Sequence, residues 1–271
     1  MARSNIPKGI NRSLSPTITI IFLGLLLVVF AGQSHAAEWA SLKGRFVFDG
    51  DPPAPAEITA DKDVEVCGKH KLVNEELVVS EDNGIANVVL FVRSKGVTVH
   101  PDLEDGSKSA PLVLDNKDCR FQPHVGFVQT GQTLTIKNSD PVGHNSNIAT
   151  MKNSPSNSLV PSNGSSDVTF SRDEAIPASV TCNIHPWMKA YLVIRPNPYG
   201  VVTSADGSFE IENLPVGEEL EFQLWHEKGG YLDEFTLGGK KTSAKRGRID
   251  FTVEEGGTDL GDIVVDGKVF N

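Results

Sequence analysis

The segment "TCNIHPWMKAYLVI" places a cysteine, a histidine and a methionine three residues apart, as Cys182, His185 and Met188. Their thiolate, imidazole and thioether groups are donors that suit copper as it cycles between two oxidation states. A tight loop between two strands can direct positions i, i+3 and i+6 towards one point. A second imidazole must come from elsewhere, and "NSDPVGHN" supplies His144 after the strand-like run "GQTLTIKN". We therefore predict a metal site formed by His144, Cys182, His185 and Met188.

Two other interpretations use the same residues. The segment "CGKH" repeats the C-x2-H spacing, so that Cys67, His70, Cys182 and His185 could form a Cys2His2 zinc site. That site leaves His144 and Met188 without a role. In the plainest interpretation Cys182 is a small buried apolar residue and Met188 belongs to a hydrophobic core.

The elements that must position these residues are predicted to be β-strands. Short runs rich in β-branched and aromatic residues alternate with turn signals such as Asp-Gly and Gly-Gly, and no long segment shows a helical apolar period. The runs are "NVVLFVRS", "QTLTIKN", "AYLVIRP", "GSFEIEN", "LEFQLWH" and "RIDFTV". Many short strands with polar turns are typical of sandwiches and barrels, so the fold class is all-β. The Ser- and Asn-rich stretch 151–171 is predicted to be a long surface loop with a marginal strand.

The chain divides into three predicted segments. Residues 1–36 combine a positive start, the apolar stretch "TITIIFLGLLLVVFA" and the small residues "SHAA", which is typical of a cleaved signal peptide. An uncleaved membrane anchor is the alternative. The prolines of "RPNPYG" suggest a boundary, which gives a first domain at 37–196 and a second at 197–271.

Charge restricts the partners. The formal net charge of −10 argues against nucleic acid and anionic membranes. Cleavage of the leader would leave no stable membrane insertion and a periplasmic or secreted protein. We interpret the basic run "KKTSAKRGR" as a solvated loop between two strands.

The stretch "FQPHVGFVQTGQTLTIKNSDPVGHN" resembles the first-ligand region of plastocyanin-like proteins, and "CNIHPWM" resembles the C-x2-H-x2-M loop of amicyanin. Both belong to the blue copper family, the cupredoxins. The resemblance implies a Greek-key β-sandwich with a type 1 copper, in which His144, Cys182 and His185 are equatorial ligands and Met188 is the axial ligand. It also implies that Asn145 ties the two ligand loops together.

If Cys182 holds copper, two of the three cysteines remain, Cys67 and Cys119. Pairing them closes a loop of about 50 residues and would stabilise the fold by about 4 kcal/mol in the chain-entropy model. Of the other histidines, His124 lies within the matched stretch. It either approaches the metal end or lies on the surface.

The segment "GVVTSADGSFEIENLPVGEELEFQLWHEK" resembles the carboxypeptidase regulatory-like, or transthyretin-like, β-sandwich. The joint arrangement resembles exported proteins labelled methylamine-utilisation-like. These resemblances imply one-electron transfer with a redox partner such as a cytochrome c or a periplasmic oxidoreductase, which would dock near His185, Pro186 and Trp187. Two alternatives are an envelope binding module and copper handling without electron transfer. A closed four-ligand site would leave no open position for a substrate, so we do not expect an enzyme.

Overall fold

The computed structural model describes residues 38–271, and almost every regular element in that range is a β-strand. The predicted signal peptide, and the membrane anchor that is its alternative, lie outside the described residues. Within residues 38–271 no helix has the length and apolar character needed to cross a bilayer.

Nineteen strands and one short α-helix succeed one another along the described chain. Their bounds are β1 Trp39–Asp49, α1 Val64–Cys67, β2 Val89–Val92, β3 Leu112–Lys117, β4 Arg120–Gln122, β5 Val125–Gln129, β6 Thr133–Asn138, β7 His144–Ala149, β8 Ser156–Val160, β9 Ser165–Thr169, β10 Ala178–Thr181, β11 Lys189–Arg195, β12 Gly200–Val202, β13 Ser208–Pro215, β14 Glu219–His226, β15 Gly230–Tyr231, β16 Glu234–Leu237, β17 Lys240–Ser243, β18 Arg248–Thr252 and β19 Thr258–Asp266. Each of the six runs predicted to be strands overlaps one along at least half of its length, which confirms those predictions and the all-β class.

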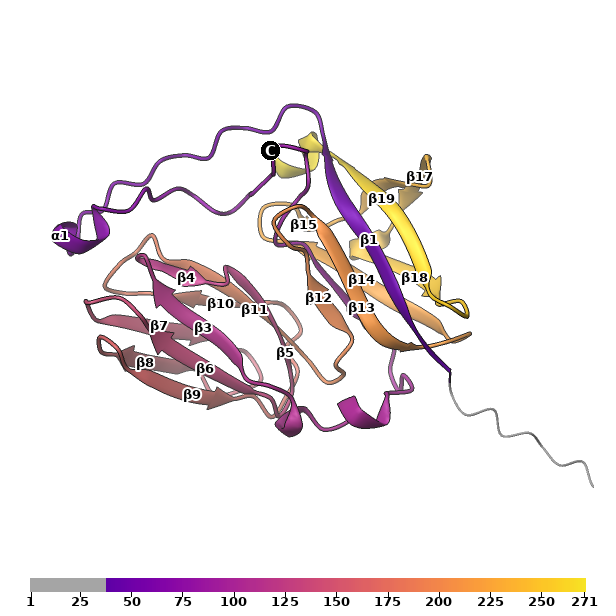
Figure 1. The fold of residues 1–271 in the computed structure, drawn as a ribbon, viewed down its shortest axis with the longest axis horizontal. Helices are drawn as coiled ribbons and strands as arrows, with labels where there is room; N and C mark the ends of the chain where they lie inside the picture. The colour runs from indigo at the N-terminus through magenta and orange to yellow at the C-terminus, as the bar shows by residue number, and fades with distance from the viewer. Residues whose placement is uncertain (1–37) are drawn as a thin grey trace, which may run out of the picture. The chain divides into compact units, whose positions relative to one another are not determined.

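Two of the four sheets make the first sandwich, which contains the predicted metal ligands (Figure 1). Their strand orders are β5-β11-β10-β7-β8 and β4-β3-β6-β9. The core between them contains Leu134, Ile136 and Val180, all fully buried. In β6, Leu134 and Ile136 alternate with outward-facing threonine and lysine, as a strand with one solvated face requires.

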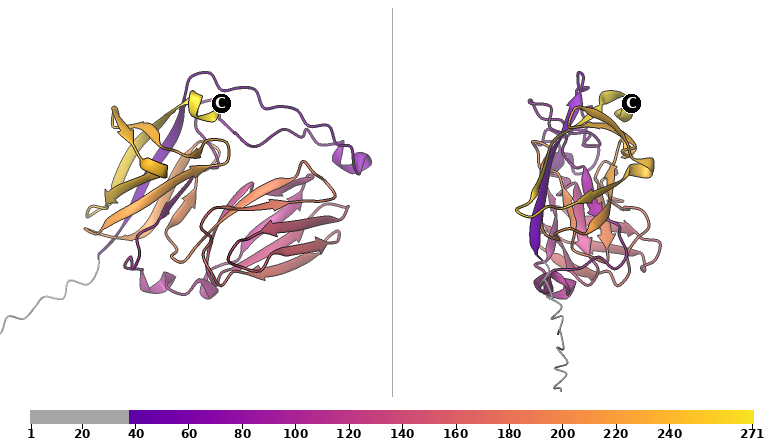
Figure 2. Two further views of the ribbon diagram at one scale, coloured as in Figure 1. Left: turned by 180° about the vertical axis from the view of Figure 1, so that it is seen from behind. Right: turned by 90° about the vertical axis from the view of Figure 1, so that its right-hand side faces the viewer.

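The other two sheets make the second sandwich, with the orders β13-β1-β19-β16-β17 and β12-β2-β14-β15, and β18 added beside β14 (Figure 2). Its core contains Phe46 of β1, Leu90 of β2 and Phe222 of β14, all fully buried. β1 lies between β13 and β19, while β2 lies between β12 and β14. Two strands from the start of the described chain therefore complete sheets built from its end.

This pairing differs from the predicted division at residue 196. The division assigns β1 and β2 to the first domain, whereas both strands hydrogen-bond with strands that follow Gly200. The prolines around 196–198 do separate β11 from β12. Residues 37–271 form one compact unit, in which the first sandwich is an insertion between β2 and β12.

The stretch 151–171 was predicted to be a long surface loop with a marginal strand, whereas the structure has two paired strands there. It contains β8 and β9, which pair with β7 and β6 respectively and lie at the edges of their sheets. Polar residues at a sheet edge discourage pairing with another chain, which fits their composition; Leu159 of β8 is 69% exposed, whereas Val160 is buried in the core.

The two sandwiches share a small apolar cluster, in which Phe91 and Trp225 of the second pack with Val125 and Val193 of the first. His226 ends β14 nearby and is only 1% exposed. Its Nδ1 accepts hydrogen bonds from the backbone N–H groups of Lys228 and Gly229 at 3.2 and 3.4 Å. Burial is the main cause that lowers the pKa of His226 to about 4, so that the ring is neutral in the native protein at pH 7.

We predict that acid destabilises the protein partly through His226. Between pH 6.5 and pH 4 the unfolded chain binds a proton at this ring and the native chain does not, so stability falls as the pH falls. His226→Asn keeps a hydrogen-bond acceptor and does not titrate. Its loss of unfolding free energy between pH 7 and pH 5, measured with urea, should be about 2 kcal/mol smaller than that of the wild type. The half-exposed His70→Asn is the control, and equal losses in all three proteins would contradict the prediction.

Candidate metal centre

Adjacent strands of one sheet bring the predicted ligands together. His144 begins β7, and Cys182 directly follows β10, which pairs antiparallel with β7. His185 and Met188 lie in the loop that connects β10 to β11. Because an antiparallel pair places the start of one strand beside the end of the next, His144 and Cys182 meet at the same end of the sandwich.

Hydrogen bonds within the loop fix its shape. The backbone N–H of Cys182 donates to the carbonyl of Met188 at 3.3 Å, and the N–H of Met188 donates to the carbonyl of His185 at 2.9 Å. The N–H of His185 donates to the Sγ of Cys182 at 3.4 Å. The loop therefore closes on itself and carries all three side chains with it.

Three of the four predicted ligands form one buried cluster. A ligand atom from each of His144, Cys182 and His185 lies within 4.8 Å of the other two. The Sγ of Cys182 is 3.7 Å from Nδ1 of His185, and the centroids of the two imidazole rings are 4.5 Å apart. Met188 is 1% exposed and belongs to the same apolar core as Cys182.

Both imidazoles are held from behind by a carboxylate. Nε2 of His144 lies 2.9 Å from Oδ2 of Asp140, and Nε2 of His185 lies 2.8 Å from Oδ2 of Asp63. These contacts leave the Nδ1 atoms for the cluster, and Nδ1 of His144 is buried with no hydrogen-bond partner. Metal-binding histidines commonly donate their second ring N–H to a carboxylate in this way. A thiolate and two imidazoles that direct their Nδ1 atoms into the cluster fit a first-row transition metal such as copper or zinc.

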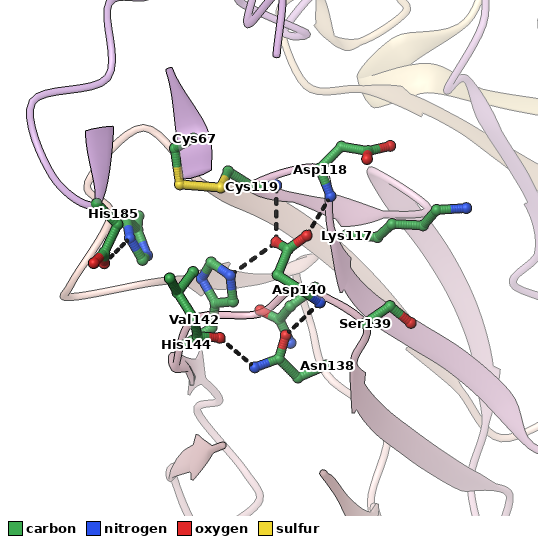
Figure 3. Close-up of polar contacts among 12 residues, drawn as sticks. Cys67, Lys117, Asp118, Cys119, Asn138, Ser139, Asp140, Val142, His144 and His185 are labelled. Carbon is green, nitrogen blue, oxygen red and sulfur yellow. Dashed lines mark hydrogen bonds and ion pairs between the residues drawn. A yellow bond between two sulfur atoms is a disulfide. The ribbon is translucent and has the colours of Figure 1, made fainter. Parts of the chain in front are cut away.

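The carboxylate of Asp140 makes further bonds besides that to His144 (Figure 3). It accepts hydrogen bonds from the backbone N–H groups of Asp118 and Cys119 at 2.8 and 2.9 Å. Burial opposes ionisation of Asp140, yet the bonds from His144 and from both N–H groups lower its pKa overall. Asp140 is therefore a buried negative charge with three donors around it.

The metal-free cluster forms a thiolate–imidazolium pair. Burial raises the pKa of Cys182, but the two histidines outweigh it and lower the pKa to about 5. Burial lowers the pKa of His144, but Asp140 and Cys182 outweigh it and raise the pKa to about 9. At neutral pH the sulfur is thus already in the ionised form that binds metals.

Asn145 connects the two ligand segments, as the resemblance implied. Its Oδ1 accepts a hydrogen bond from the backbone N–H of Asn183 at 2.8 Å and lies 3.5 Å from the Sγ of Cys182. Its Nδ2 donates to Oδ1 of Asn157 in β8 at 2.8 Å. Asn145 therefore ties the loop after β10 to β7 and β8.

Cys67 and Cys119 form a disulfide, which confirms that prediction. The Cys2His2 alternative is therefore wrong, because Cys67 has no free thiolate. His70 lies apart from the cluster, with its Nδ1 3.6 Å from a carboxylate oxygen of Asp118. Cys182 is the free cysteine of the described chain and is buried.

Two expectations about histidines are not met. His124 neither reaches the cluster nor lies on the surface, because its side chain is 9% exposed and its Nε2 lies 2.5 Å from Oε2 of Glu227 in the second sandwich. His185 was expected at a docking surface, yet it is fully buried. Pro186 is exposed, and Trp187 is partly buried.

The sequence interpretation missed both carboxylates. Asp140 could have been found, because it lies four residues before His144 within the same matched stretch. Asp63 is 122 residues from His185 in the chain, so no local pattern connects the two.

No protein-family model matches the chain, and neither does any curated protein. Several solved structures match part of the chain. A copper-containing nitrite reductase from Thermus scotoductus SA-01 matches at 17% identity and a TM-score of 0.30, over 38% of this chain and 25% of its own. A Cu(I) amicyanin mutant matches at 17% identity and a TM-score of 0.28, over 39% of this chain and 97% of its own. A purple cupredoxin from Nitrosopumilus maritimus matches at 18% identity and a TM-score of 0.27. The match covers 32% of this chain and 99% of the purple cupredoxin.

We predict that Asp140→Ala weakens both the fold and the metal centre. The change leaves the buried N–H of Cys119, the partly buried N–H of Asp118 and the ring of His144 without their acceptor, so the free energy of unfolding of the metal-free protein should fall by about 3 kcal/mol. Loss of a carboxylate behind a ligand should lower the affinity for cupric ion about 10–100-fold. Urea unfolding and competitive copper titration measure the two effects. Asp115→Ala removes a nearby carboxylate that contacts Ser139 instead of a ligand. Equal affinities in the two variants would contradict the prediction.

Proposed function

We propose that this chain is an exported copper protein that transfers single electrons through a type 1 site. His144, Cys182 and His185 would be the equatorial ligands, and Met188 the axial ligand. The observation that carries this proposal is the buried cluster of one thiol and two imidazoles, whose ligand atoms lie within 4.8 Å of one another. A soft thiolate, two imidazoles and a weak thioether are the donor set that suits copper in electron transfer.

Copper held by these donors would supply the one-electron couple. The task of the protein is to keep the donors in nearly the same places in both oxidation states. Each imidazole is fixed at Nε2 by a carboxylate, and the loop that carries Cys182 is closed by its own backbone hydrogen bonds. Asn145 connects that loop to the neighbouring strands. Because so few of these groups can move, little reorganisation would accompany electron transfer.

The same features favour a carrier over an enzyme. Four protein donors would close the coordination sphere, and a closed sphere offers no position to a substrate. All three clustered side chains are at most 2% exposed, which keeps water and other ligands away from the centre. We propose a redox protein, such as a cytochrome c or a periplasmic oxidoreductase, as the partner, and a periplasmic or secreted location.

Copper handling without electron transfer is the second candidate. The burial of His185 favours it, because the ring that was expected to face a redox partner has no exposed surface. In this role the protein would bind and deliver the ion. The two candidates differ in the rate of electron self-exchange, which should be fast for a carrier and undetectable for a protein that only binds copper.

The visible spectrum tests the proposed site. The copper-loaded, oxidised protein should show a strong blue or green band from charge transfer between the thiolate and copper. Cys182→Ser should abolish the band, because Cys182 supplies the thiolate, while circular dichroism shows that the β-fold is retained. A colourless wild-type protein that takes up zinc in preference would overturn the type 1 assignment, as would full colour in the variant.

Replacement of Met188 tests the axial position. Met188→Leu conserves volume in the core, so it should cost less than about 1.5 kcal/mol of stability. A weak axial ligand tunes the site without forming it, so the band should persist at a shifted wavelength and the reduction potential should change. Met151→Leu, at an exposed methionine, is the matched control. A spectrum and potential identical to the wild type would remove Met188 from the ligand set.

A further inference from the structure

Residues 50–74, here called the strap, form a long hairpin that leaves β1 and returns towards β2 (Figure 1). Its two arms are joined by a bridge between Glu57 and Val73 and by a hydrogen bond from the N–H of Ile58 to the carbonyl of Leu72 at 2.9 Å. The helix α1 lies at its tip. Figure 2 shows the same hairpin from behind.

The tip of the strap is attached covalently to the first sandwich. Cys67 ends α1 and is bonded to Cys119, which lies between β3 and β4. Around the disulfide a small apolar cluster buries Ala60, Leu72 and both half-cystines. The strap is therefore a packed element with a core of its own.

That core extends to the ligand loop through Trp187. The indole ring packs on the cluster, and its Nε1 donates a hydrogen bond to the carbonyl of Cys119 at 3.0 Å. Trp187 in turn contacts His185, with ring centroids 5.2 Å apart. The disulfide, the indole and the imidazole thus form a continuous line of contacts from the strap to the cluster.

Asp63, which lies in the strap, contacts the outer edge of His185. His185 lies between the rings of His144 and Trp187, and Oδ2 of Asp63 accepts the hydrogen bond from its Nε2 edge. His185 is fully buried, whereas its neighbours Ile184 and Pro186 in the chain are exposed. Asp63 has 41% of its side chain exposed, so its carboxylate separates the imidazole from solvent.

We propose that the strap is a disulfide-anchored cover that orients His185 and shields the cluster, with Asp63 as its positioning residue. The role of the cover at a metal rests on the proposed function, but the shielding of His185 is a property of the chain alone. An electron that passes to a partner cannot leave through an exposed imidazole edge while the strap is closed.

Chemical modification of the metal-free full chain tests the cover. Diethyl pyrocarbonate acylates accessible imidazoles, and peptide mass mapping gives the rate at each histidine. In the wild type His185 should react slowly relative to the half-exposed His70. Asp63→Ala should raise the rate at His185 by about tenfold or more, because a charge-assisted hydrogen bond no longer holds the strap closed. Asp63→Asn, which keeps an acceptor oxygen, should restore most of the protection.

Matched variants separate the cover from general loosening. Asp61→Ala removes an exposed charge two residues away in the strap and should leave the rate at His185 unchanged. Cys67→Ala/Cys119→Ala frees the tip and should raise the rate as Asp63→Ala does. His226, buried in the second sandwich, reports unfolding of the whole chain. The proposal is overturned if Asp63→Ala leaves His185 protected, or if the rate at His226 rises equally.

The copper-loaded protein gives an independent readout. Asp63→Ala should shift the visible band and speed the loss of copper to a chelator by about tenfold, whereas Asp61→Ala should do neither. A wild type that binds no copper but shows Asp63-dependent protection of His185 would refute the proposed function and leave the cover intact. A blue protein whose His185 is protected equally with and without Asp63 would refute the cover alone.

Discussion

The carboxylate of Asp140 is the contact at which the candidate ligands and the disulfide meet. One of its oxygens accepts a hydrogen bond from His144, and the same carboxylate binds the backbone N–H groups of Asp118 and Cys119. Asp118 and Cys119 both have positive φ angles, 55° and 54°, a conformation that costs residues other than glycine about 1 kcal/mol or more each. The turn persists because two of its N–H groups share one buried anion. This turn presents Cys119 to the strap, so a single side chain orients a ligand ring and sets the anchor point of the cover.

The two imidazoles are held by carboxylates from different parts of the fold. Asp140 precedes His144 by four residues and is buried, whereas Asp63 reaches His185 from the strap and is partly exposed. His144 is thus oriented by the first sandwich itself, whereas His185 is oriented by the strap. In the metal-free chain the imidazolium of His144 balances the thiolate of Cys182. Binding of a metal at Nδ1 must displace that proton, which couples metal affinity to pH.

The sequence was informative where chemistry and chain position coincide. Cys182, His185 and Met188 lie in one loop, and His144 lies at the start of a paired strand, so their spacing predicted that they come together. In the structure, ligand atoms of His144, Cys182 and His185 lie within 4.8 Å of one another, and whether they bind a metal stays a prediction. The disulfide was predicted because assigning Cys182 to the metal leaves Cys67 and Cys119 as the remaining two of three cysteines. The partners of β1 and β2 could not be predicted, because neither the partly alternating pattern of β1 nor the continuous apolar run of β2 shows which sandwich the strand joins. Asp63 was missed because its contact with His185 depends on how the strap folds back. No local sequence pattern indicates that path.

The second sandwich gives the strap its base. The strap begins where β1 ends and returns past Gly84, which bridges to Val47, so both of its arms start from that sandwich. Its tip is bonded to the first sandwich through Cys119.

The sandwiches are also joined beside the ligand loop, where Glu227 binds both His124 and Lys189, the residue that follows Met188. The strap starts from the second sandwich and is bonded to the first. It can therefore hold its position over His185 only if the two sandwiches are fixed relative to each other. The buried Glu227 pairs and the apolar contact of Phe91 and Trp225 with Val193 supply that restraint. The second sandwich is therefore part of the architecture that closes the candidate metal centre.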